Sequence, residues 1–118
     1  MNILIADDEK GLVELMGEAL TRRGYSVDTA LDGPRALEML LTGKYDVAFL
    51  DLSIPEITGL EIIDEIRKKG IKTKAVMITG YQLMDGEFLK GVGVDEYMAK
   101  PLKFEEIQKL LKKYENPS

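Results

Sequence analysis

The chain has 118 residues, of which 45% are hydrophobic and 31% are charged, a composition typical of one ordinary globular domain. It contains neither cysteine nor histidine, which excludes disulfides, cysteine nucleophiles, serine–histidine–aspartate catalysis and imidazole-ligated zinc. The net charge of -5 argues against direct nucleic-acid binding, and no apolar run approaches the ~18 residues of a membrane span. The N-terminal segment MNILIADDEK becomes acidic too early for a secretory signal, so we expect a cytoplasmic protein.

Short apolar runs, typical of β-strands, alternate with longer amphipathic segments along the chain. The strand candidates are residues 2–6, 26–30, 46–50, 74–78 and 94–98. The first, third and fourth contain continuous apolar runs, at residues 3–6, 47–50 and 75–78, as expected for parallel strands buried on both faces. The second and fifth carry polar residues and are therefore predicted to lie at the edges of the sheet.

Between these runs, apolar residues recur at the i, i+3, i+4 and i+7 spacing of one helix face. Thr58, followed three residues later by Glu61, predicts a capping box at the start of one helix. A segment at about residues 83–90 is the weakest helix candidate, because Gly86 and Gly91 fall in or near it and glycine costs roughly 1 kcal/mol relative to alanine inside a helix. The other helical stripes cover residues 12–20, 36–41, 60–66 and 104–114.

This alternation predicts an α/β fold of the (βα)5 type, with one domain over residues 1–118. The parallel five-stranded sheet should be doubly wound, with right-handed crossovers and helices on both faces. Polar strands two and five at the edges, with strands one, three and four inside, fit the flavodoxin-like strand order 2-1-3-4-5.

Polar residues follow the strand candidates where ligands bind in such sheets, at the carboxyl ends of the strands near the topological switch point. Strands one, three, four and five are neighbours in the predicted order, so these residues should converge on one pocket. They are Asp7, Asp8 and Glu9 after strand one, Asp51 after strand three, Thr79 after strand four and Lys100 after strand five.

Three carboxylates in one pocket repel one another unless a cation lies among them. Mg2+ prefers oxygen ligands and typically keeps several waters beside one or two carboxylates, so Asp8 and Asp51 are candidate ligands. Asp51 could then act as a nucleophile that forms an aspartyl phosphate. Lys100 would neutralise phosphoryl charge, and the Thr79 hydroxyl would donate a hydrogen bond to a phosphoryl oxygen.

At this point the sequence resembles the receiver domain of two-component response regulators over nearly its whole length, in a form similar to the chemotaxis regulators. Each matching piece is weak alone, but together and in this order they are specific. The pieces are the acidic pair Asp7-Asp8, the segment DLSIPEITG that begins at Asp51, the dipeptide Thr79-Gly80, and the segment VDEYMAKP that ends at Pro101.

The resemblance implies that Asp51 accepts a phosphoryl group from a sensor histidine kinase or a histidine phosphotransfer protein. It implies a Mg2+ cofactor, with Mn2+ as a substitute, bound directly by Asp8 and through water by Asp7. Asp51 and the backbone carbonyl of Ser53 would complete the protein ligands.

The same resemblance implies a signalling switch that catalyses only its own phosphorylation and dephosphorylation. Thr79 and Tyr97 would change conformation together. This change would alter the surface formed by the helix at about residues 83–90, the strand at 94–98 and the helix at 104–114, which are helix 4, strand 5 and helix 5 of the predicted fold. Downstream, it implies a protein target or an effector domain outside these residues, and phosphorylation-dependent homodimerisation. Residues expected to shape the loops are Pro55, Gly59, Gly80 and Pro101, with a cis peptide between Lys100 and Pro101.

The sequence leaves open several alternative roles for these residues. Asp7-Asp8 alone could cap a helix, Lys100 could be an ordinary exposed lysine, and Tyr97 could be a packing residue. A flavin binder shares the fold, but acidic residues after strand one would repel its phosphate. The sequence lacks the glycine-rich lysine motif of P-loop nucleotidases. A phosphorylation-independent receiver-like module and a metal-dependent phosphatase remain competing functions.

Overall fold

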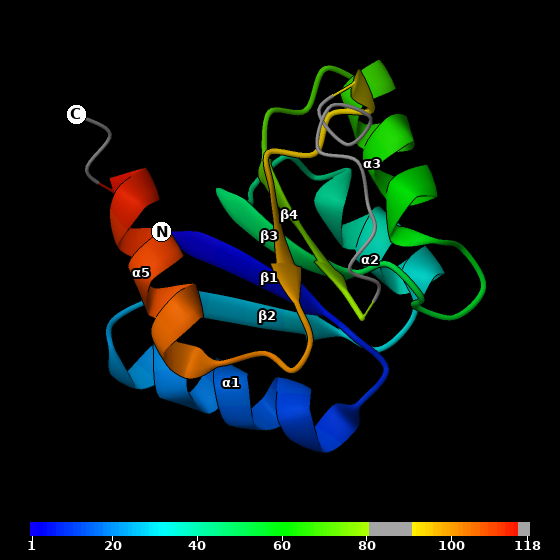
Figure 1. Ribbon diagram of the computed structural model, residues 1–118. Helices are drawn as coiled ribbons and strands as arrows, with labels where there is room; N and C mark the ends of the chain where they lie inside the picture. Colours follow the sequence, from blue (N-terminus) through cyan, green and yellow to red (C-terminus); the bar gives the residue numbers. More distant parts are fainter. Residues whose placement is uncertain (81–90, 116–118) are drawn as a thin grey trace.

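A computed structural model describes residues 1–80 and 91–115 of the chain (Figure 1). Up to residue 79, strands and helices alternate as predicted, and a strand and a helix follow after residue 91. The predicted helix at about residues 83–90 lies outside the described residues. The elements are β1 (Asn2–Ala6), α1 (Lys10–Arg22), β2 (Ser26–Ala30), α2 (Gly33–Leu40), β3 (Val47–Asp51), α3 (Gly59–Lys68), β4 (Lys74–Thr79), β5 (Glu96–Ala99) and α5 (Phe104–Glu115).

The five strands form one parallel sheet in the order β2-β1-β3-β4-β5, which confirms the predicted topology. Every residue of β3 is buried, whereas β2 and β5 each keep exposed positions. The polarity of a strand therefore predicted its place in the sheet, because central strands are covered on both faces and edge strands are not.

Helices cover both faces of the sheet, with α1 and α5 on one side and α2 and α3 on the other (Figure 1). Alternate side chains of each strand point to opposite faces, so one strand contributes to two cores. In β1, Leu4 packs into the core under α2 and α3, while Ile3 and Ile5 pack into the core under α1 and α5. Full burial of one such side chain stabilises the fold by roughly 1.5–3 kcal/mol.

Helices α2 and α3 each begin with a side-chain cap. Thr58 Oγ1 accepts a hydrogen bond of 3.2 Å from the backbone N–H of Glu61, which is one of the two bonds of the predicted capping box. The Glu61 carboxylate accepts from the Thr58 hydroxyl at 3.4 Å instead of from the Thr58 backbone. Asp32 caps α2 in the same manner, accepting from Arg35 N at 2.8 Å. These caps fix the start of each helix directly after a loop that leaves the carboxyl end of a strand.

Strand β5 begins two residues later than predicted, at Glu96, and ends at Ala99. The difference is caused by a contact between Asp95 and Ala75 of β4. Its side chain accepts a hydrogen bond from Ala75 N at 2.8 Å, and its own N–H donates to Ala75 O at 2.9 Å. The carboxylate of Asp95 thus occupies a position that a backbone carbonyl of β5 would otherwise fill.

Among the described residues, no helix is both long enough and apolar enough to cross a membrane.

Candidate functional site

Polar side chains gather at the carboxyl ends of β1, β3, β4 and β5, as predicted. Asp7, Asp51 and Thr79 are among the few buried polar residues of the described chain, with exposed fractions of 1%, 1% and 2%. Asp8 is exposed at the rim, and the Lys100 side chain is 32% exposed. Burial of two carboxylates at one end of the sheet is expensive without a compensating cation, and this indicates a functional site.

The carboxylates of Asp7, Asp8 and Asp51 each place an oxygen within 4.8 Å of the other two. Oδ1 of Asp7 accepts a hydrogen bond of 3.0 Å from Glu9 N, which orients the carboxylate at the end of β1. The other oxygen, Asp7 Oδ2, is buried and has no hydrogen-bond partner among the described residues. A buried acceptor without a donor is a position that a bound cation or water would satisfy.

The environment of Asp7 disfavours its ionised form. Burial raises the pKa of the Asp7 carboxyl above its ordinary value, and the nearby Asp51 and Asp8 carboxylates add to this increase. The backbone hydrogen bond from Glu9 and the charge of Lys100 act in the opposite direction but do not outweigh burial. When ionised, the carboxylates of Asp7, Asp8 and Asp51 therefore lack enough nearby positive charge to balance them.

Lys100 supplies part of that charge from the end of β5. Its Nζ donates a hydrogen bond of 2.8 Å to Asp51 Oδ2, and its backbone N–H donates to Thr79 O at 2.9 Å. The hydrogen bond to Asp51 raises the pKa of the Lys100 ammonium group, so Lys100 is a cation at neutral pH. The structure thus brings together Lys100 and Asp51, which were predicted to converge on one pocket.

The second oxygen of Asp51 is held by the loop that follows β3. Asp51 Oδ1 accepts hydrogen bonds from Ser53 N at 3.1 Å and from Ser53 Oγ at 3.2 Å. The backbone carbonyl of Ser53 was the predicted contributor to the site, and the contact of the Ser53 hydroxyl with Asp51 was not predicted. The Asp-x-Ser spacing could have indicated the backbone hydrogen bond, because aspartate side chains often bind the backbone two residues on, but it gives no signal for the hydroxyl contact.

The predicted loop residues differ in what surrounds them. A Cβ at Gly59 would lie 2.9 Å from Met77 Sδ and 3.1 Å from Asp51 O, so a side chain there would press against the strand that carries Asp51. A Cβ at Gly80 would meet nothing within 4 Å among the described residues. Pro55 O accepts a hydrogen bond of 3.0 Å from the N–H that begins α2, and the Lys100-Pro101 peptide is cis, as expected.

Tyr97 lies on β5 but faces the surface. It pairs in register with Met77 of β4, and its side chain is 51% exposed, whereas the next residue, Met98, is 8% exposed. The strand alternation therefore directs Met98 towards the core and Tyr97 towards solvent. Tyr97 is not among the buried residues that surround Asp51.

The residues present fit a hard divalent cation. All candidate ligands offer oxygen, as Mg2+ prefers, and Asp7 contributes a buried oxygen that still needs a partner. The mutual repulsion that raises the pKa of Asp7 would be relieved by a dication among the three carboxylates. Asp7, Asp8 and Asp51 are therefore the side chains that could hold such an ion.

The model of the response regulator receiver domain family matches residues 3–112 of the chain. Among curated proteins, the transcriptional regulatory protein DltR of Streptococcus agalactiae is 36% identical over 111 residues, covering 91% of this chain and 48% of DltR. The alkaline phosphatase synthesis transcriptional regulatory protein PhoP of Bacillus subtilis is 36% identical over 114 residues, covering 93% of this chain and 46% of PhoP. This chain therefore spans about half the length of these relatives.

Solved structures agree with the sequence matches. The response regulator protein TrrA of Thermotoga maritima, in complex with Mg2+-BeF, is 38% identical with a TM-score of 0.82, and the match covers 96% of this chain and 97% of TrrA. The chemotaxis response regulator CheY4 of Vibrio cholerae is 28% identical with a TM-score of 0.86, covering 96% and 97% of the two chains. From the family match, the shared fold and the acidic site, we conclude that this chain belongs to the response regulator receiver domains of two-component signalling systems.

Proposed function

We propose that this domain is a Mg2+-dependent switch that accepts a phosphoryl group on Asp51. One observation carries the proposal: the carboxylates of Asp7, Asp8 and Asp51 lie within 4.8 Å of one another, with Lys100 Nζ 2.8 Å from Asp51. This arrangement combines a nucleophile, metal ligands and a fixed cation at one end of the sheet. It is supported by the relative TrrA, whose structure is a complex with Mg2+-BeF.

In the reaction, a carboxylate oxygen of Asp51 attacks the phosphorus of a phosphohistidine on a partner sensor kinase or phosphotransfer protein. The new aspartyl O–P bond forms as the donor N–P bond breaks, and the donor imidazole leaves and takes up a proton. Mg2+, or Mn2+ in its place, would neutralise charge on the phosphoryl oxygens when bound by Asp7, Asp8, Asp51 and the Ser53 carbonyl.

The protein's own residues do the remaining work. Hydrogen bonds from Ser53 to Asp51 Oδ1 hold the nucleophile in one orientation. The Lys100 ammonium group, now bound to Asp51, would follow the negative charge onto the transferred phosphoryl group. The hydroxyl of Thr79, which is buried at the end of β4, would donate to a phosphoryl oxygen.

The output follows from a population shift between two conformations. Movement of Thr79 and Lys100 towards the phosphoryl group would let Tyr97 turn from its exposed position inward. The surface formed by β5, α5 and the helix predicted at about residues 83–90, which lies outside the described residues, would then rearrange. The domain would act in the cytoplasm on a protein target, on an effector domain outside these residues, or through a phosphorylation-dependent homodimer.

The test is the intact mass of the protein after incubation with acetyl phosphate, with and without Mg2+. We expect a labile gain of one phosphoryl group that requires the metal and is lost in Asp51→Asn. Asp46→Asn, at an exposed aspartate before β3, is the matched control and should label as the wild type does. Labelling that persists in Asp51→Asn would overturn the assignment of the acceptor. No labelling with acetyl phosphate or with a phosphorylated histidine kinase would favour a phosphorylation-independent interaction module.

A further inference from the structure

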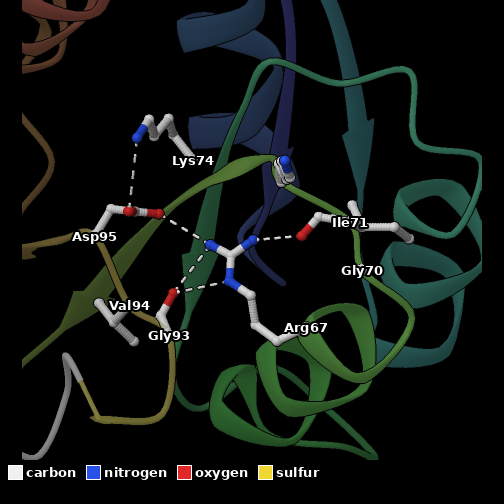
Figure 2. A pocket seen from close by; sticks show the side chains of 8 residues that line it. Arg67, Gly70, Ile71, Lys74, Gly93, Val94 and Asp95 are labelled. Carbon is white, nitrogen blue, oxygen red and sulfur yellow. Dashed lines mark hydrogen bonds and ion pairs between the residues drawn. The ribbon is translucent and has the colours of Figure 1, made fainter.

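The side chain of Arg67, in the last turn of α3, reaches across to the segment that leads into β5 (Figure 2). Its Nε and Nη2 donate to Gly93 O at 3.1 and 2.9 Å, and its Nη1 donates to Ile71 O at 2.7 Å. Nη2 also donates to Asp95 Oδ2 at 2.9 Å. The planar guanidinium group thus fixes three acceptors in one rigid geometry, which a flexible ammonium group could not do.

The position before β5 is built to receive this side chain. Gly93 has a φ of +97°, and a Cβ there would lie 2.7 Å from Arg67 Cγ and 2.9 Å from Arg67 Nε. Only glycine combines that backbone conformation with so close an approach. The Arg67 side chain therefore packs directly against the Gly93 backbone, in the space that a side chain at position 93 would occupy.

Asp95 continues the connection from Arg67 to the sheet. The Asp95 Oδ2 atom that accepts from Arg67 also accepts from Ala75 N at 2.8 Å, and the Asp95 N–H donates to Ala75 O at 2.9 Å. Lys74 Nζ lies 3.9 Å from the other carboxylate oxygen. Arg67, Asp95 and Ala75 thereby fix the register of β5 on β4 at the entrance to the strand, beside a hollow of about 630 Å3 (Figure 2).

Strand β5 needs such fixing because it is short and lies at the edge of the sheet. It has four residues, Glu96–Ala99, which pair with Val76–Thr79 of β4. Lys100 follows directly, with its Nζ at Asp51. A slip of one residue moves a strand by about 3.3 Å, more than enough to break the contact of Lys100 with Asp51.

We propose that Arg67 is a positioning residue for phosphoryl transfer, which acts through Asp95 and the register of β5 to hold Lys100 at Asp51. The proposal rests on the proposed function of Asp51 as acceptor. Arg67 would thus influence the reaction at Asp51 from the opposite end of β5.

The first experiment is a double-mutant cycle on the rate of labelling by acetyl phosphate with Mg2+. Arg67→Met keeps an unbranched apolar chain near the backbone and removes the guanidinium group with its hydrogen bonds. We expect the rate to fall on the order of tenfold because a positioned group is displaced. In a Lys100→Ala background, Arg67→Met should cause no further decrease, since the residue it positions is already absent. Arg67→Lys should restore only part of the rate.

Two controls separate positioning from loss of stability. Arg35→Met removes an exposed arginine that pairs with Glu38 on α2, and it should leave the rate unchanged. Ile66→Val trims the fully buried neighbour of Arg67 on α3, so it should lower the melting temperature without a tenfold loss of rate. An equal decrease for Arg67→Met in both backgrounds, or a decrease no larger than that of Ile66→Val, would overturn the proposal.

A second readout does not depend on phosphorylation. The Lys100 N–H, which donates to Thr79 O, should exchange with solvent faster in Arg67→Met, while amides of β1 keep their protection. Unchanged exchange at Lys100 would refute the positioning role. A wild type that cannot be labelled would defeat the function proposed for Asp51, and the exchange rates would then still decide whether Arg67 holds Lys100 in place.

Discussion

The ammonium group of Lys100 lies 2.8 Å from Oδ2 of Asp51 and so brings a cation from the edge strand to a carboxylate that is 1% exposed. The two residues are 49 positions apart in the sequence. Their contact depends on the parallel order of β3, β4 and β5, which places the ends of these strands side by side. The contact satisfies one oxygen of Asp51, and Ser53 satisfies the other.

We predict that Lys100→Ala keeps Mg2+ binding and loses most of the phosphorylation. Removing the positive charge of Lys100 reduces its repulsion of Mg2+, so the affinity for Mg2+ should rise. The transferred phosphoryl group loses a stabilising cation, and such a loss typically lowers the rate about a hundredfold. Calorimetry would measure the Mg2+ affinity, and intact mass would measure the labelling rate. Lys68→Ala, at an exposed lysine paired with Asp64, is the control. An unchanged labelling rate in Lys100→Ala would remove Lys100 from the mechanism.

We predict that Asp7→Asn stabilises the metal-free protein at neutral pH. Because the folded state raises the pKa of Asp7 above its ordinary value of 3.8, the native protein binds more protons there than the unfolded chain. Stability therefore falls as the pH rises from that ordinary value through the raised pKa, and it stays lower at pH 7. Replacement by asparagine should recover about 1 kcal/mol of unfolding free energy.

The same substitution should reduce the stabilisation that added Mg2+ provides, since a ligand is lost. Urea unfolding with and without Mg2+ measures both effects. Asp8→Asn is the comparison, because Asp8 is exposed. This substitution should also weaken Mg2+ binding, but it should raise the stability of the metal-free protein by less than Asp7→Asn does. If metal-free Asp7→Asn were less stable than the wild type, Asp7 would be a structural residue and not a strained ligand.

We predict that Tyr45→Phe destabilises the protein by about 1 kcal/mol at pH 7 through loss of one hydrogen bond. The hydroxyl of Tyr45, which is 4% exposed, donates to Asp28 Oδ2 at 2.6 Å, and this bond lowers the pKa of Asp28 below 3.8. The stabilisation is present above that value and is lost as the pH falls through the lowered pKa. The effect of the mutation in urea unfolding should shrink accordingly in acid, and it should vanish in an Asp28→Ala background.

We predict opposite effects for two Gly→Ala substitutions on helices. Gly17 lies inside α1, where a Cβ would make ordinary contacts of 3.7 Å with Thr29 and Val27, so Gly17→Ala should stabilise by about 1 kcal/mol. Gly33 begins α2, and a Cβ there would lie 2.7 Å from Ile57 O, so Gly33→Ala should destabilise by roughly 1–3 kcal/mol. Thermal unfolding of both variants decides the point, and a stabilised Gly33→Ala would mean that the loop after Asp51 adjusts freely.

Much of this fold could be predicted because its signals are local. The continuous burial of β3 follows from its apolar run, and the exposed positions of β2 and β5 follow from their polar residues. The convergence of Asp7, Asp51 and Thr79 then follows from topology alone, because the carboxyl ends of neighbouring parallel strands meet at one edge.

The features that escaped prediction depend on contacts between distant segments. Nothing near Arg67 in the sequence indicates that its guanidinium group binds Gly93 and Asp95, which lie 26 and 28 residues later. The start of β5 was misplaced for the same reason, since Asp95 uses its side chain to bond Ala75 N. Side-chain orientations such as that of Ser53 Oγ towards Asp51 also require the folded loop.

Helix α5 leads away from Asp51. It begins at Phe104, just after the Lys100-Pro101 peptide, and rises about 1.5 Å per residue, or roughly 18 Å over its length, to Glu115. Its last turn lies near the start of the chain, because Tyr114 and Met1 line the same hollow (Figure 1). A fluorescent reporter or a fused domain joined beyond α5 would thus start at the end of the sheet opposite to Asp51, the proposed acceptor. If Asp51 is phosphorylated as proposed, we expect such a fusion to leave the site open to the phosphodonor and to respond only to conformational changes transmitted across the domain.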